Sequence, residues 1–61
     1  MDPPAHPPDY LRPPEVANRL GISTSLVLKL IKRGKLPAVR IGHLWRIPRA
    51  EFEDWLHSLQ A

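Results

Sequence analysis

The side chains best suited to binding chemistry are small hydroxyls and cations that lie between residues 23 and 33 of this 61-residue chain. In order they are Ser23, Thr24, Ser25, Lys29, Lys32 and Arg33. Hydroxyl groups donate and accept hydrogen bonds, and lysine and arginine bind phosphate oxygens. On a short helix this combination suits entry into a nucleic-acid groove. An ordinary solvated helix face also carries lysines, and this segment alone does not separate the two interpretations.

Basic residues are concentrated in the middle of the chain, which has a formal net charge of +3. Between residues 16 and 50 there are eight basic residues and no acidic one, whereas the acidic residues lie toward the two ends. This segregation predicts a positive field that is typical of a polyanion-binding surface. Binding to a membrane surface would require the cations on one long amphipathic helix, so we expect no membrane partner.

Catalysis and metal binding have little support in the sequence. The chain has no cysteine, and His43 has no second metal-binding residue near it. Glu51, Glu53 and Asp54 are too close together on one predicted helix to flank a substrate, and no nucleophile has a base at a recognisable spacing. We therefore expect no enzymatic activity, no metal and no cofactor.

Two short helices joined by three residues are predicted to position the hydroxyl and basic side chains. Prolines favour the start of a helix over residues 13–20, which Gly21 ends. Ser23 can cap a second helix over Thr24–Arg33, and Gly34 follows its last residue. Its inner face is predicted to hold Leu26, Val27, Leu30 and Ile31, and its outer face Thr24, Ser25, Leu28, Lys29, Lys32 and Arg33.

A strand period replaces the helix period after residue 37. Four apolar residues recur at strand spacing: Val39, Ile41, Trp45 and Ile47. A three-residue turn at 42–44 would place all four on one inner face, with Arg40 opposite Arg46 on the outer face. A two-residue turn would put Arg46 across from Val39, so we predict the three-residue turn. The two arginines would repel each other unless an anion such as a phosphate lay between them.

The two ends of the chain complete the prediction. Residues 1–9 are proline-rich and are expected to form a disordered tail, which leaves residues 10–61 as the folded domain. A final amphipathic helix is expected from Arg49 to Leu59, closing a core in which Trp45 is the largest buried ring. No stretch is apolar over the length of a membrane span, so we expect a soluble, intracellular protein.

Taken together, these segments resemble the excisionase-type, MerR-like winged-helix DNA-binding family. The resemblance covers about residues 10–59, and its most specific parts are residues 11–21, 31–42 and 45–55. It implies a mainly α fold with a small β-hairpin, a winged helix-turn-helix. The helix over 24–33 would dock in the major groove of double-stranded DNA, and the hairpin over 38–47 would touch the minor groove or the backbone as a wing.

The resemblance also implies which residues contact DNA. The recognition helix and its cap would supply Ser23, Thr24, Ser25, Leu28, Lys29, Lys32 and Arg33, and the wing would supply Arg40, His43 and Arg46. Leu28 and Leu44 depart from the family, which commonly has polar or basic side chains there. Leu28 could contact a thymine methyl group, and Leu44 at the wing tip is better placed to contact a neighbouring protomer.

Small members of this family resemble excisionases, the recombination directionality factors of phages and mobile elements. This implies cooperative DNA binding, DNA bending, self-association along DNA, and a tyrosine integrase as partner that is directed toward excision. It also implies a location in the host-cell cytoplasm, in association with the nucleoid. The alternative is a small MerR-like transcriptional regulator, which would normally continue past Ala61 into a dimerising helix or sensor domain. A protein-protein adaptor that acts through the proline-rich tail is a third hypothesis.

Overall fold

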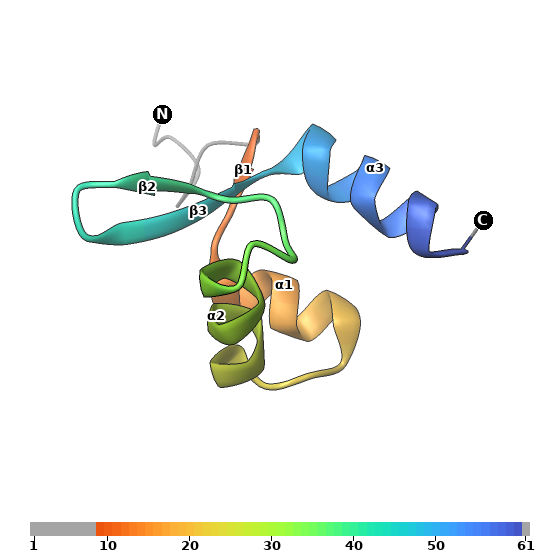
Figure 1. Ribbon diagram of the computed structural model, residues 1–61, viewed down its shortest axis with the longest axis horizontal. Coiled ribbons are helices and arrows are strands. Elements are labelled where there is room, and N and C mark those ends of the chain that lie inside the picture. Colours follow the sequence, from red (N-terminus) through yellow and green to blue (C-terminus); the bar gives the residue numbers. More distant parts are fainter. Residues whose placement is uncertain (1–8, 61) are drawn as a thin grey trace, which may run out of the picture.

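The computed structural model describes residues 9–60 and has the predicted winged helix-turn-helix architecture. Its elements, in order, are β1 (Tyr10–Leu11), α1 (Pro13–Leu20), α2 (Thr24–Lys32), β2 (Val39–Ile41), β3 (Leu44–Pro48) and α3 (Arg49–Gln60). Figure 1 shows α1 and α2 packed together below the strands, with the β2–β3 hairpin and α3 extending in opposite directions. The mainly helical composition and the hairpin are therefore confirmed.

The ends of the two central helices follow the sequence signals closely. Gly21 after α1 has a φ of 70°, and Gly34 after α2 has a φ of 71°. At the start of α2, the Leu26 N–H donates to the Ser23 side-chain oxygen at 3.1 Å. These caps fix the three-residue connection between the helices, which determines how α2 is presented.

The start of α1 has a cap that the sequence reading missed. The N-cap residue is Arg12, which is not one of the usual capping types. Its backbone N–H donates to the Glu15 carboxylate at 2.8 Å. Glu15 thus supplies the return bond of a capping box, which satisfies a backbone donor that would otherwise lack a partner in the helix.

The core lies where α1, α2 and α3 meet the strands. Its buried residues are Leu11, Val16, Ala17, Val27, Ile31, Leu36, Ile47 and Phe52. Phe52 is fully buried, and its ring stacks against Trp55 with centroids 5.9 Å apart. Trp45 is only partly buried, so the expectation that it would be the largest buried ring is wrong. The largest fully buried ring is Phe52, because the first turn of α3 places it in the core while much of the hairpin extends beyond the core.

One arginine joins α1 to α3 over this core. The guanidinium of Arg19 lies 5.4 Å from the centre of the Phe52 ring, and it forms an ion pair with Glu53 at 3.1 Å. Because both side chains of the ion pair are partly exposed, the pair itself contributes little stability. The aliphatic part of Arg19 can nevertheless shield one side of the buried ring from water.

The sheet is antiparallel and has β3 in its centre, between β1 and β2. The short strand β1 was not predicted, and it pairs Leu11 with Ile47. Next to it, the Asp9 carbonyl oxygen accepts a hydrogen bond from the Arg49 N–H at 2.7 Å. Asp9, the last residue of the predicted tail, therefore contacts the start of α3, and the rest of that tail lies outside the described residues.

The predicted register of the hairpin is wrong. Val39 pairs with Arg46 and Ile41 pairs with Leu44, so the turn has two residues and consists of Gly42 and His43. Gly42 has a φ of 64°, which suits the first position of a type II′ turn, and such turns match the twist of hairpin strands. Since the hairpin projects from the core (Figure 1), turn geometry rather than burial sets the register.

Candidate nucleic-acid interface

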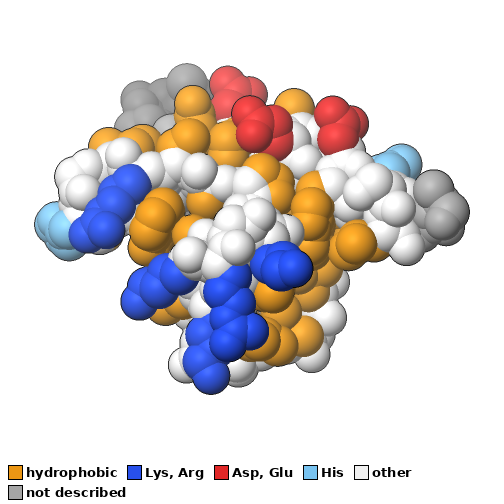
Figure 2. Space-filling model, viewed as in Figure 1, with side chains coloured by type: hydrophobic (Ala, Val, Ile, Leu, Met, Phe, Trp, Pro, Cys, Tyr) orange, Lys and Arg blue, Asp and Glu red, His pale blue; other side chains and the backbone are white. Residues whose placement is uncertain are grey.

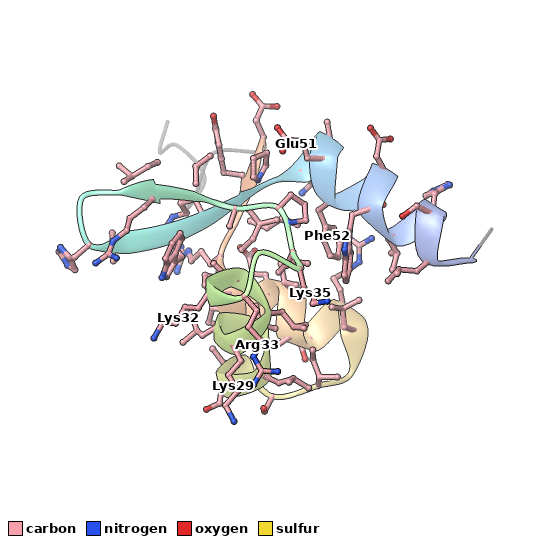
Figure 3. The ribbon with its side chains drawn as sticks, in the orientation of Figure 1. Lys29, Lys32, Arg33, Lys35, Glu51 and Phe52 are labelled. Atoms are coloured by element: carbon pink, nitrogen blue, oxygen red, sulfur yellow. The ribbon has the colours of Figure 1, made fainter. Side chains whose placement is uncertain are left out.

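The second helix presents a polar face because its apolar side chains are anchored in the core. Val27 and Ile31 are one turn apart and both are buried. This orientation turns Ser25, Lys29 and Lys32 toward solvent, and all three are exposed. Figure 3 shows Lys29, Lys32 and Arg33 extending outward from α2. The predicted basic face is therefore formed, and a helix of this width fits the major groove of B-form DNA.

Two leucines of this helix lie on the opposite faces from those predicted for them. Leu28 was expected on the exposed face, but it is partly buried and packs against the core. Leu26 was expected on the inner face, yet 42% of its surface is exposed. The reason is the angular position of the core, which is centred on Val27 and Ile31. At 100° per residue, Leu28 lies nearer to that centre than Leu26 does.

The cap of α2 keeps hydrogen-bonding capacity on the same surface. Ser23 uses its oxygen to accept from the Leu26 N–H, and a hydroxyl that accepts can still donate its own proton. Thr24 and Ser25 follow at the first two helical positions, and both are exposed. Three hydroxyls thus stand at the start of the helix, where backbone N–H groups also favour an anion.

Lys35 extends the basic surface beyond the helix and was missing from the predicted contacts. After Gly34, the Lys35 N–H donates to the Leu30 carbonyl oxygen at 2.8 Å, which completes a Schellman motif. This bond holds Lys35 beside the end of α2, as Figure 3 shows. A lysine directly after a capping glycine was the signal in the sequence that could have identified it.

We call Lys29, Lys32, Arg33 and Lys35 the basic ridge. All four are exposed, and none forms an ion pair with an acidic side chain in residues 9–60. Figure 2 shows Lys and Arg side chains gathered over α2 and its C-terminal turn, whereas Asp and Glu side chains lie along the opposite, upper margin. On this face the basic ridge is therefore separated from the acidic side chains, and it can be neutralised by a polyanion.

The hairpin arginines do not act as the predicted pair. Because residues paired across strands share a face, Arg40 lies with Trp45, and Arg46 lies with Val39 on the other side. The guanidinium of Arg40 is 5.3 Å from the centre of the Trp45 ring, and its Nε donates to the Gly42 carbonyl oxygen at 3.3 Å. Trp45 packs against the core, so Arg40 is on the side of the hairpin that faces the helices.

Arg46 and His43 are the two other residues predicted to contact DNA from the wing. Arg46 is partly buried and donates to the Trp45 carbonyl oxygen at 2.7 Å. His43 is exposed in the turn. The expectation that Arg40 and Arg46 share the outer face is therefore wrong for Arg40, because the two-residue turn places it on the face of Trp45, whereas Arg46 lies on the outer face as predicted.

The part of the chain that the structure describes gives no support for a metal site or a membrane-spanning helix. Within residues 9–60, no group of three or more His, Cys, Asp or Glu side chains is arranged to hold a metal ion. Across the same residues, the helices lack the length and apolar character that a membrane crossing requires.

Comparisons with known proteins agree with this geometry. A family model described as a helix-turn-helix domain matches residues 10–60. A protein from Saccharopolyspora erythraea named "Probable excisionase" is 38% identical over 47 residues, which cover 77% of this chain and 48% of that relative. The chain thus spans about half the length of the relative it matches. No solved structure matches the chain significantly.

Proposed function

We propose that this chain, which belongs to the helix-turn-helix domain family of DNA-binding proteins, acts as an excisionase-type architectural protein. In this proposal α2 enters the major groove of double-stranded DNA, and the hairpin follows the neighbouring backbone or minor groove as a wing. The observation that carries the proposal is the basic ridge: four exposed cations of one short segment, none of them paired with an acid in residues 9–60.

The basic ridge would supply affinity, and the start of α2 would supply recognition. Lysine and arginine contacts to phosphates position a protein on the duplex, and side chains that reach base edges read the sequence. Residues at the start of a recognition helix are the ones that reach those edges. Each phosphate neutralised should contribute a slope of roughly −0.9 to the dependence of log affinity on log salt. One domain with this small set of cations should therefore bind with modest, strongly salt-dependent affinity.

An excisionase does more than bind DNA: it also bends the DNA, binds it cooperatively and acts together with a recombinase. The relative named "Probable excisionase" supports that role. Bending a site by tens of degrees costs on the order of 1 to 6 kcal/mol, which a single small domain would supply poorly. We therefore propose that several copies bind side by side in the nucleoid of the host cell and direct a tyrosine integrase toward excision.

The proposal is tested by DNA binding first and recombination second. Sequencing the gene neighbourhood should reveal an adjacent integrase gene and its attachment site, which would supply the substrate DNA. Gel shifts on that DNA should give successive, cooperative complexes, and added protein should raise excision by the purified integrase. DNA binding without any effect on excision would refute the excisionase role. Repression of a neighbouring promoter in the same experiments would favour a transcriptional regulator instead.

A further inference from the structure

Leu26 is a large apolar side chain on the face of α2 that otherwise carries hydroxyls and cations. It is 42% exposed, although its neighbour Val27 is fully buried. At helical spacing Leu26 shares a stripe with Lys29, three residues on, and with Arg33, seven residues on. A leucine here adds little to the core, and it stands in the middle of the surface that the proposed function turns toward DNA.

The position of Leu26 along the helix is as informative as its exposure. It is the third residue of α2, in the first turn, and its N–H is held by the Ser23 side chain at 3.1 Å. Residues in this turn of a recognition helix contact base edges rather than phosphates. The cations of the basic ridge lie farther along the helix or beyond its end, so they are better placed for phosphates. In the proposed docking of α2, Leu26 would thus be an apolar group at the depth of the bases, on a backbone held by the Ser23 cap.

We propose that Leu26 determines specificity by packing against the 5-methyl group of one thymine in the major groove. This inference rests on the proposed DNA-binding function and names what that site reads. A leucine side chain forms no hydrogen bonds, and the thymine methyl is the apolar group that a standard base pair presents in this groove. Cytosine has a hydrogen in place of this methyl group, so Leu26 would bury less apolar surface against it. The same methyl group occurs on 5-methylcytosine, so the chemistry read is a pyrimidine 5-methyl.

The test removes single methyl groups from the DNA. A preferred site is first selected from a pool of random duplexes, and each thymine in it is then replaced, one at a time, by deoxyuridine. Fluorescence anisotropy measures the affinity of the unaltered protein and of Leu26→Ala for each duplex. We expect one thymine position at which deoxyuridine weakens binding of the unaltered protein about fourfold, the effect of one buried methyl group. Leu26→Ala should bind the thymine and deoxyuridine duplexes equally.

Two matched variants locate the effect. Leu59→Ala removes the same atoms from a 62%-exposed leucine on α3, and Leu44→Ala removes them from a 45%-exposed leucine at the wing tip. Both should keep the fourfold preference for thymine. Alanine is the strongest helix former, so Leu26→Ala should remain folded, which circular dichroism checks. At the sensitive position, 5-methylcytosine should bind better than cytosine, because it restores the methyl group.

Three results would overturn the inference while leaving DNA binding intact. They are a selected site in which no thymine is sensitive to deoxyuridine, a preference that survives in Leu26→Ala, and a preference that Leu44→Ala abolishes instead. Absence of any selected sequence would overturn both this inference and the proposed sequence-specific function. The two failures are therefore distinguishable in one set of measurements.

Discussion

Lys29 extends from the centre of the exposed face of α2, and no acidic side chain in residues 9–60 pairs with it. Its charge is therefore available to a phosphate. Replacing it with alanine removes one cation and leaves a strong helix former, so the melting temperature should hardly change. We expect Lys29→Ala to weaken DNA binding several-fold and to make the log–log salt slope shallower by about 0.9.

A charge-matched control separates this contact from general electrostatic attraction. Arg49 is exposed at the start of α3, where it lines a surface groove with Glu15 and Arg19. Arg49→Ala removes the same charge from outside the basic ridge, so affinity and salt slope should stay close to those of the unaltered protein. Equal losses in Lys29→Ala and Arg49→Ala would mean that net charge, and not the ridge, drives binding.

The two hairpin arginines give a second prediction at the residue scale. Arg40 lies on the face of the hairpin that carries Trp45 and is directed toward the helices. Arg46 lies on the opposite face, and its guanidinium donates a hydrogen bond to the Trp45 carbonyl oxygen. If DNA covers α2 and the near side of the wing, Arg40→Ala should weaken binding more than Arg46→Ala. Gel shifts on one duplex measure both. A larger loss in Arg46→Ala would mean that the wing approaches DNA with its other face.

Among the elements, α3 contributes one fully buried side chain to the core. Phe52 is fully buried, so its replacement by alanine should cost about 3 to 5 kcal/mol. A domain of this size has a total stability of roughly 3 to 9 kcal/mol, at about 0.05 to 0.15 kcal/mol per residue. Phe52→Ala should therefore be largely unfolded, whereas Trp45→Ala, which removes a partly buried ring, should remain folded with a lower melting temperature. Thermal denaturation followed by circular dichroism compares them, and a greater loss in Trp45→Ala would contradict this view of the core.

The elements also show what could be predicted from the sequence. Local signals set the helix ends, since Gly21, Ser23 and Gly34 act within one turn of chain. These ends were predicted to within one residue, because α2 ends at Lys32 and Arg33 is its C-cap. The strand β1 was missed because two residues carry no periodicity. The hairpin register failed because the prediction assumed a core beneath all four apolar strand residues. Two of them, Val39 and Ile41, are exposed.

The candidate site was predictable where it follows from composition and unpredictable where it follows from packing. Lys29, Lys32 and Arg33 lie outward, as their charge requires. Leu26 and Leu28 have the same side chain, so only the orientation of α2 on the core decides which one is exposed. Likewise, the face on which Arg40 lies depends on the length of one turn. The exposure of these side chains is determined by long-range contacts and by turn geometry, which patterns of single residues do not encode.

In the whole molecule, the outer side of the hairpin faces away from the core and carries three exposed apolar side chains beside Arg46. These residues are Val39, Ile41 and Leu44, and each has between 39% and 56% of its surface exposed. A second copy bound next to the first on DNA would bury such a surface without requiring a stable dimer in free solution. In the proposed function, that arrangement would supply the binding energy that DNA bending requires, because each added copy would gain an apolar contact as well as its phosphate contacts.

Ile41→Gln tests this arrangement, because it makes the most exposed of the three side chains polar at similar size and adds no charge. We expect the variant to bind a duplex with one site as the unaltered protein does, since the recognition helix is untouched. On a duplex with two adjacent sites its binding should lose cooperativity, which gel shifts measure as separate rather than concerted occupancy. Leu59→Gln makes the same kind of change on α3 and should stay cooperative. Cooperativity that survives in Ile41→Gln, or is lost equally in Leu59→Gln, would place the contact between copies elsewhere on the molecule.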